Sequence, residues 1–194
     1  MLNQVFTAGK EKMLKNGKIV KITGGELRGQ KIRTPGDGTH PMGERERIAL
    51  FNMLGDAVKG NRVIDLYCGG MTLGIEAISR GAMYALGIDH SPEAVEVANQ
   101  NLKKLGVHGL RGGAIHGPLP TVLRTATDRY GIVIADPPYD KYQEKDTKFY
   151  ARVVLDGGIL VLSHPGEAPE IEGMTLEKSR SYAGARISIY RKNK

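Results

Sequence analysis

From residue 62 onward, short apolar runs alternate with segments whose apolar residues recur at helical spacing. A β-strand followed by a helix and a second parallel strand needs such an alternation, because the chain must cross over to begin the next strand. The pattern therefore predicts an α/β fold, a mostly parallel sheet with helices on both faces. Strands are expected at 63–67, 85–89, 110–116, 132–135 and 158–162, and helices at 71–82, 91–106, 119–125 and from about 139 to 155.

The two ends of the chain depart from this alternation. Residues 176–182 and 185–191 alternate around Ala183-Gly184 and predict a hairpin that adds an antiparallel edge to the sheet. Upstream, 19–22 and 31–33 predict a small separate β-hairpin. Apolar residues at helical spacing predict a helix over 44–58 that docks on the main sheet. We expect three parts: an N-terminal tail (1–17), a basic hairpin and helix extension (18–61) and the main domain (62–194).

The positive charge of the chain is concentrated near its N-terminus. The net charge is +7, and residues 1–62 carry 12 Lys and Arg against 6 Asp and Glu. The remaining residues are almost balanced, with 16 against 15. A basic excess confined to one segment favours contact with a polyanion, since each phosphate contact releases condensed counterions.

Composition excludes several classes of protein. With 40% hydrophobic and 25% charged residues, the chain is neither disordered nor collagen-like. No apolar run approaches the roughly 18 residues of a membrane span, and the first residues do not resemble a secretory signal, so we expect a cytoplasmic protein. Cys68 is the single cysteine, which excludes an internal disulfide and a multi-cysteine zinc site.

Two acidic strand ends point to a nucleoside-containing cofactor. Asp65 begins the sequence Asp-Leu-Tyr-Cys-Gly-Gly, in which a strand feeds a glycine-rich turn and then a helix. Asp89 ends the next strand, where a carboxylate can accept both hydroxyls of a ribose. Taken alone, the glycine-rich turn is also compatible with a tight strand–helix connection, and Asp89 with a helix cap or turn carboxylate. A P-loop is absent from the sequence, which disfavours a nucleotide hydrolase.

The fourth strand ends in Asp136-Pro137-Pro138-Tyr139. Two prolines restrict the backbone, so that the carbonyls of Asp136 and Pro137 can be aimed rigidly into a cleft. A carboxylate and a carbonyl can accept both hydrogens of an exocyclic amine, while the tyrosine stacks on the base. The alternative is a Pro-Pro turn with a tyrosine packed in the core.

These motifs resemble those of S-adenosylmethionine-dependent amino-methyltransferases. Within that class, ITGGELRGQKI, Pro41, ERERIALFNML, LGIEAISRGA and YAGARISIYRK resemble the RsmD family over about 18–192. The resemblance implies a Rossmann-like class I methyltransferase with a seven-stranded sheet. It also implies methyl transfer from S-adenosylmethionine to the N2 amine of a guanine in small-subunit (16S) ribosomal RNA, without a metal. The expected partner is that RNA or a small-subunit assembly particle, bound by a monomer away from any membrane.

The resemblance assigns roles to individual residues. Catalysis is assigned to Asp136, Pro137, Pro138 and Tyr139. Cofactor binding is assigned to Asp65, Tyr67, Cys68, Gly69, Gly70, Thr72, Asp89, His90, Pro118 and Leu119. RNA contact, or shaping of the target pocket, is assigned to Arg28, Lys31, Arg33, His40, Arg45 and Arg47. A solvated hairpin edge or helix face is the alternative for each basic residue.

Three positions depart from the family pattern. Met71 stands where a second glycine is usual, so we expect the cofactor loop to follow another path or to rely on Gly70. Pro118 stands where an acidic residue usually contacts the adenine amine, which predicts up to about tenfold weaker cofactor binding. His40-Pro41-Met42 replaces Arg-Pro-Thr. Two other functions remain open: an amino-methyltransferase acting on another RNA base, DNA or protein, and a non-catalytic RNA-binding assembly protein.

Overall fold

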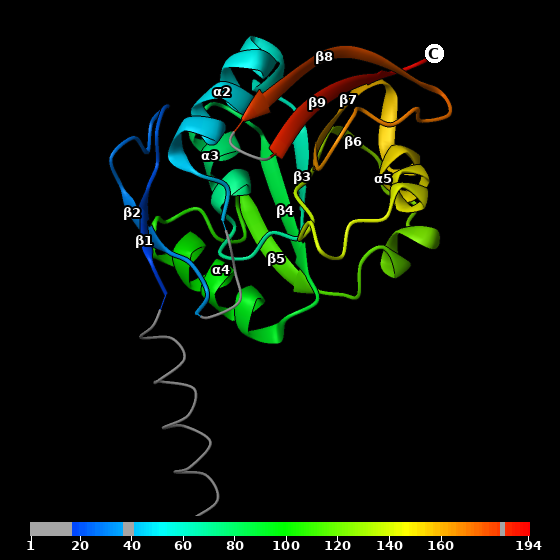
Figure 1. The fold of residues 1–194 in the computed structure, drawn as a ribbon. Helices are drawn as coiled ribbons and strands as arrows, with labels where there is room; N and C mark the ends of the chain where they lie inside the picture. Colours follow the sequence, from blue (N-terminus) through cyan, green and yellow to red (C-terminus); the bar gives the residue numbers. More distant parts are fainter. Residues whose placement is uncertain (1–16, 37–40, 183–184) are drawn as a thin grey trace, which may run out of the picture.

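The computed structural model describes residues 17–36, 41–182 and 185–194. In this part of the chain, seven strands form one sheet in the order β5-β4-β3-β6-β7-β9-β8 (Figure 1). Strands β3 to β7 run parallel to one another, β9 is antiparallel to β7, and β8 is antiparallel to β9. The sheet confirms the predicted α/β class and the antiparallel C-terminal hairpin. Its strands are β3 (Arg62–Leu66), β4 (Tyr84–Asp89), β5 (Gly112–His116), β6 (Tyr130–Ala135), β7 (Val154–His164), β8 (Met174–Tyr182) and β9 (Ala185–Lys192).

Helices cover both faces of the sheet (Figure 1). One face packs against α2 (Glu44–Leu54), α3 (Thr72–Ser79) and α4 (Pro92–Lys104). The other face packs against α5 (Thr147–Arg152) and the 3-10 turn η2 (Thr121–Arg124). Successive strand residues serve opposite faces, as the twofold strand repeat requires: Val63 belongs to the first core and Ile64 to the second.

Several element boundaries differ from those expected. The helix predicted over 44–58 is α2 followed by the 3-10 turn η1 (Gly55–Val58), because Gly55 adopts a positive φ of 54° and ends the α-helix. The polar helix expected after residue 139 consists of η3 (Glu144–Asp146) and α5, so β7 already begins at Val154. The helix expected at 119–125 is the short 3-10 turn η2.

The predicted N-terminal hairpin consists of β1 (Ile19–Lys21) and β2 (Lys31–Arg33), which pair with each other and not with the main sheet. The fully buried carboxylate of Glu76 on α3 anchors it. This carboxylate accepts hydrogen bonds from the backbone amides of Thr23 and Gly24 at 3.0 Å. Arg80 and Arg47 lie on its other sides, with closest N–O distances of 3.0 and 3.9 Å. A buried charge is stable only with such partners.

Buried Asn101 on α4 makes a second link between the hairpin and the main domain. Its side-chain oxygen accepts from the Arg33 amide at 3.0 Å, and its side-chain nitrogen donates to the Arg33 carbonyl at 2.7 Å. The same nitrogen donates to the carbonyl of Gly70 at 2.8 Å. The Asn101 side chain therefore connects strand β2 with the glycine-rich turn after β3.

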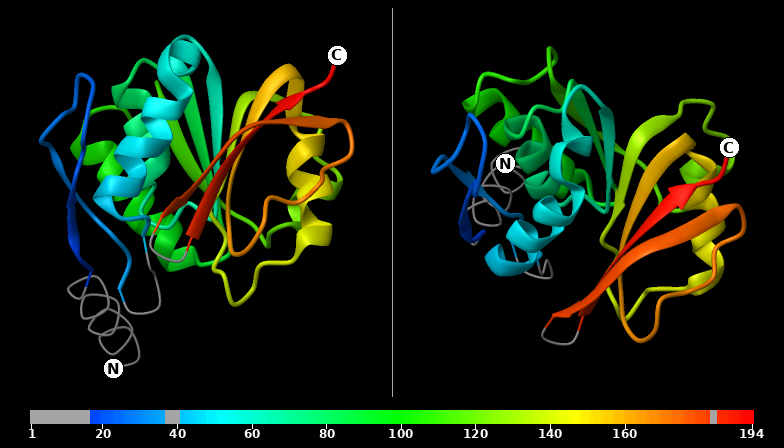
Figure 2. Two further views of the ribbon diagram at one scale, coloured as in Figure 1. Left: turned by 45° about the horizontal axis from the view of Figure 1, so that its top comes forward. Right: turned by 90° about the horizontal axis from the view of Figure 1, so that it is seen from above.

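The hairpin lies beside α2 and α3, at the edge of the molecule opposite α5 (Figure 2). On the other side of α2, the end of β8 and the start of β9 reach toward the start of that helix (Figure 2). Within the described ranges, no helix is long and apolar enough to cross a membrane.

Candidate active site

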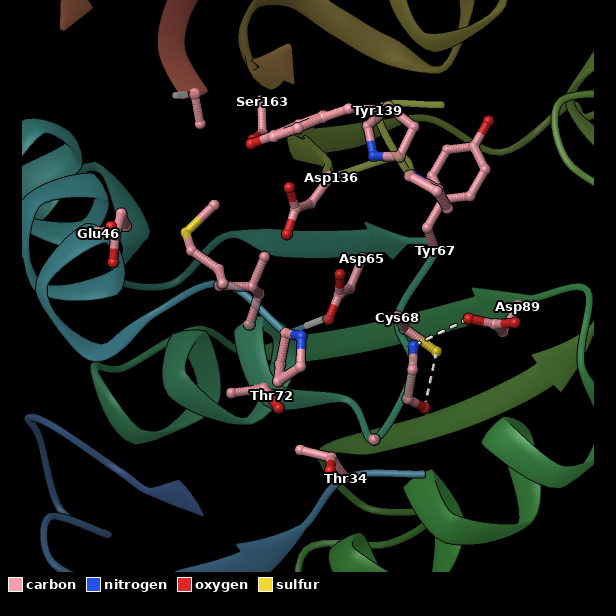
Figure 3. A pocket seen from close by; sticks show the side chains of 18 of the residues that line it. Thr34, Glu46, Asp65, Tyr67, Cys68, Thr72, Asp89, Asp136, Tyr139 and Ser163 are labelled. Carbon is pink, nitrogen blue, oxygen red and sulfur yellow. Dashed lines mark hydrogen bonds between the residues drawn. The ribbon is translucent and has the colours of Figure 1, made fainter. Parts of the chain in front are cut away.

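A cavity of about 680 Å³ opens at the carboxyl ends of β3, β4 and β6, where ligands bind in open α/β sheets (Figure 3). The glycine-rich turn and Asp89 line it from the sheet, and the loop after β6 lines it from the other side. The start of α2 and the β8–β9 hairpin complete its wall. Residues far apart in the sequence therefore share one pocket.

The turn after β3 follows a path that requires unusual backbone angles. Tyr67, Gly69 and Met71 have positive φ values of 62°, 50° and 65°. A side chain at Gly70 would come within 2.5 Å of the Arg33 carbonyl oxygen, so only glycine fits there. The Gly69 amide donates to Oδ2 of Asp89 at 2.9 Å, which ties the turn to β4.

Met71 is accommodated inside the turn rather than on its surface. Its side chain is completely buried and fills the space that a Cβ on Gly74 or Gly87 would occupy. Glycines inside a helix and a strand normally lower stability, so these two have a packing reason here. Met71 at this position is thus compatible with an intact pocket.

Asp65 is a buried carboxylate at the end of β3. Its Oδ2 accepts the Gly74 amide at 2.8 Å, at the start of α3. Burial raises the pKa of Asp65 to about 8, and this hydrogen bond opposes the shift only in part. The pocket therefore holds a carboxyl group that is protonated in a large fraction of molecules at neutral pH.

The loop after β6 presents Asp136 and Tyr139 to the cavity (Figure 3). Burial raises the pKa of Asp136 to about 6, while a hydrogen bond with the Ser163 hydroxyl lowers it. The Tyr139 hydroxyl lies 2.7 Å from Oγ of Ser163, at the end of the neighbouring strand β7. Tyr139 is 41% exposed as a residue, so it has free surface on which a base could stack.

Most of the predicted site residues meet at this cavity. The catalytic positions and eight of the ten cofactor positions line it: Asp65, Tyr67, Cys68, Gly69, Gly70, Thr72, Asp89, His90, Asp136, Pro137, Pro138 and Tyr139. Pro118 and Leu119 do not line it and lie in the connection after β5. Pro118 is exposed there.

The basic positions divide into exposed and buried side chains. Arg28, Lys31, Arg33 and Arg45 are exposed. Arg47 is completely buried, with its guanidinium donating to the carbonyls of Met42 and Lys21 at 2.9 Å each. The expected contact between Arg47 and RNA phosphate therefore does not fit this structure. Helix geometry explains the difference, because residues two apart on a helix point to different faces. His40 lies outside the described residues.

Among the cavity residues that the sequence did not single out, two interact with Tyr139. Ser163 is one, and its only sequence signal is its position at the end of an apolar strand run. Glu46 is the other, hidden in a charged segment that resembles an ordinary solvated helix face. Within the described ranges, no group of three or more His, Cys, Asp or Glu side chains is arranged to hold a metal ion.

The sheet order, the glycine-rich turn after β3 and the acidic end of β4 define a Rossmann-like, class I methyltransferase fold. The solved structure of yhhF from Escherichia coli has the same fold, with a TM-score of 0.81 at 22% identity over 91% of this chain and 99% of that one. YlbH of Bacillus subtilis is 27% identical over 188 residues, covering 89% of this chain and 99% of YlbH.

Sequence comparison narrows the class to one family. The family described as "Conserved hypothetical protein 95" matches residues 20–191. A protein of Buchnera aphidicola named "Ribosomal RNA small subunit methyltransferase D" is 31% identical over 137 residues, 69% of each chain. The chain belongs to this family, the RsmD family of S-adenosylmethionine-dependent methyltransferases.

The residues present fit that cofactor. The cavity has the volume of a typical small-molecule site. The absence of side chains at Gly69 and Gly70 lets a ligand approach the backbone closely. The Asp89 carboxylate binds the amides of Gly69 and Ser91 at 2.9 Å each, which orients it at the position expected for a ribose contact.

Proposed function

We propose that the protein transfers a methyl group from S-adenosylmethionine to the exocyclic N2 amine of a guanine in small-subunit ribosomal RNA. The observation that carries the proposal is that the loop Asp136 to Tyr139 lines the same cavity as Gly69, Gly70 and Asp89. An amine held by the first group would therefore meet the cofactor held by the second.

The cofactor supplies a methyl group that is already activated by the positive charge on its sulfur. The chain's own residues have to position the amine. Asp136 and the Pro137 carbonyl can each accept one of its hydrogens, which directs the nitrogen lone pair toward the cofactor side. Tyr139 can stack on the base, because the hydrogen bond between its hydroxyl and that of Ser163 holds the ring in place. After transfer, the ionised Asp136 carboxylate can accept the proton that the amine loses.

The exposed basic residues favour RNA as the carrier of the target base. Lys31 and Arg33 lie on β2 and Arg28 lies in the loop before it. Arg45 lies at the start of α2, where Gly43 and Glu46 line the cavity. The name of the Buchnera relative states a small-subunit ribosomal RNA substrate for that protein. The target guanine would have to be unpaired or flipped, because its amine is otherwise held in a base pair.

Deleting the gene tests the proposal in cells. Small-subunit RNA from the deletion strain should lack one N2-methylguanosine that is present in the parent strain, as measured by mass spectrometry of the digested nucleosides. Complementation with the intact gene should restore it, and complementation with Asp136→Ala should not. An unchanged content of N2-methylguanosine would exclude guanine N2 as the target.

A further inference from the structure

The cavity contains a carboxylate to which the proposed reaction assigns no task. Glu46 lies near the start of α2, is half-buried and lines the same cavity as Asp136 and Tyr139 (Figure 3). Its negative charge is close enough to act on the Tyr139 hydroxyl. Glu46 thus belongs to the part of the pocket where the target base would lie.

The Glu46 carboxylate is chemically available. Among the described residues it makes no hydrogen bond or ion pair, and its charge acts on Arg47 and Tyr139. One of its oxygens packs over Gly43, where any side chain would collide with it. The other carboxylates that line the cavity differ from it: Asp65 binds the Gly74 amide, Asp89 binds two further amides, Asp136 interacts with Ser163, and Asp140 is exposed.

The negative charge of Glu46 makes this side of the cavity unfavourable for a phosphate group and favourable for the edge of a base that carries N–H groups. A carboxylate beside RNA repels the backbone, so it lowers affinity unless a donor on the base compensates it. Guanine offers such a donor, because its N1–H lies next to the 2-amino group. Adenine carries a lone pair at N1 and would be repelled.

We propose that Glu46 is a specificity-determining residue whose carboxylate accepts the N1–H of the target guanine, while Asp136 and Pro137 hold the neighbouring amine. The inference rests on the proposed function, because it requires guanine as the target. The alternative is that Glu46 only stabilises the N-terminus of α2, as an acidic residue in the first turn does. Glu44 shares that turn but does not line the cavity, so it supplies a charge-matched control.

The test compares Glu46→Gln, Glu46→Leu and the control Glu44→Gln with the unaltered protein. The substrate is small-subunit particles from the deletion strain, with labelled S-adenosylmethionine and identification of the methylated nucleoside. We expect kcat/KM to fall about 10- to 100-fold in Glu46→Leu, the range for losing a hydrogen bond to a charged group. Glu44→Gln should remain within about twofold, and all variants should bind S-adenosylhomocysteine equally by calorimetry.

A base analogue separates recognition from helix stabilisation. At the mapped target, 2,6-diaminopurine keeps the 2-amino group but has a lone pair at N1. We expect the unaltered protein to methylate this RNA at least about tenfold more slowly than the guanine RNA, a preference worth about 1.4 kcal/mol. Glu46→Gln, whose amide can donate to N1, should reduce that preference at least about fivefold.

The outcomes distinguish the inference from the function on which it rests. In one outcome, the unaltered protein makes N2-methylguanosine and both Glu46 variants keep its preference for guanine RNA over 2,6-diaminopurine RNA. That result overturns the role of Glu46 and leaves the proposed function intact. Equal losses on both RNAs would also overturn it, since a purely structural role predicts them. Label in adenine or in protein overturns both, because neither presents an N1–H to this carboxylate.

Discussion

At the scale of single residues, the carboxyl groups of the pocket lie in different chemical environments. Asp65 is surrounded by apolar strands and has its pKa raised to about 8, whereas Asp136, which also interacts with Ser163, has its pKa raised to about 6. Asp89 instead receives two backbone amides. Groups with separated pKa values in one cavity are typical of functional sites.

The raised pKa of Asp136 predicts the acidic limb of the pH profile. Only the ionised carboxylate accepts an N–H, so kcat/KM should fall tenfold per pH unit below about pH 6. Asp136→Asn keeps an acceptor oxygen but does not titrate. We expect it to be at least about tenfold slower at pH 7.5 and to lack this limb between pH 5 and 7. If Asp136→Asn shows the same fall of kcat/KM at low pH, Asp136 is not the group that titrates.

Burial of Asp65 predicts a stability cost that depends on pH. Its folded pKa lies above the unfolded value of 3.8, so ionisation penalises folding as pH rises from about 4 to about 8. Asp65→Asn keeps an acceptor for the Gly74 amide without this cost. We expect equal urea stability near pH 4 and a gain at pH 7 of up to about 4 kcal/mol, an upper bound from the shift. A gain independent of pH would contradict this explanation.

At the scale of elements, polar side chains fasten the N-terminal hairpin to the sheet domain. The Glu76 carboxylate accepts hydrogen bonds from backbone amides of the loop between β1 and β2, and Asn101 joins β2 to the glycine-rich turn. The hairpin therefore helps to hold the cofactor turn, although β1 and β2 do not pair with the main sheet.

Asn101 should affect cofactor binding through the turn. Asn101→Ala removes three hydrogen bonds to the backbone, one of them fully buried, and should cost about 3 kcal/mol in urea unfolding. It should also weaken S-adenosylhomocysteine binding at least about threefold by calorimetry, since the Gly70 carbonyl loses its donor. Asn99 clamps the backbone of Ala114 on β5 in a similar way, so Asn99→Ala is the matched control. Equal affinities of the two variants would contradict the coupling.

We expect the two arginines at the start of α2 to have different functions, Arg47 in stability and Arg45 in RNA binding. Arg47→Met removes a buried partner of Glu76 and should lower stability by about 3 kcal/mol or more, with the salt dependence of RNA binding unchanged. Arg45→Met should leave stability within about 0.5 kcal/mol. It should reduce the slope of log K against log salt by about 0.7 to 0.9, the effect of one phosphate contact. The reverse pattern would contradict the assignment of Arg47 as structural.

Local sequence patterns predicted the elements and the two loops that form the centre of the pocket, because both depend on short-range features. Apolar periodicity located the strands, and glycine or proline next to acidic residues marked the two loops. The roles of Arg47 and Asn101 depend on partners more than 20 residues away, which no local pattern reveals. The spacing of Arg45 and Arg47 did contain a signal, since two residues two apart on a helix cannot both face the RNA.

At the scale of the whole molecule, a basic N-terminal segment is fastened beside a cofactor pocket. The four exposed basic residues lie on the extension, while the reacting groups lie on the carboxyl ends of the main strands. Asn101 and Glu76 fix the two parts to each other. This arrangement suits an enzyme that holds a phosphate backbone with one part and modifies a base with the other.

The most direct measurement is methyl transfer from labelled S-adenosylmethionine, by purified protein, into small-subunit particles and naked RNA from the deletion strain. We predict that the label appears as N2-methylguanosine in the small-subunit RNA, and that Asp136→Ala abolishes it while still binding S-adenosylhomocysteine. Label in another nucleoside, or undiminished transfer by Asp136→Ala, would contradict the account. So would the absence of label in either substrate from a protein that binds the cofactor.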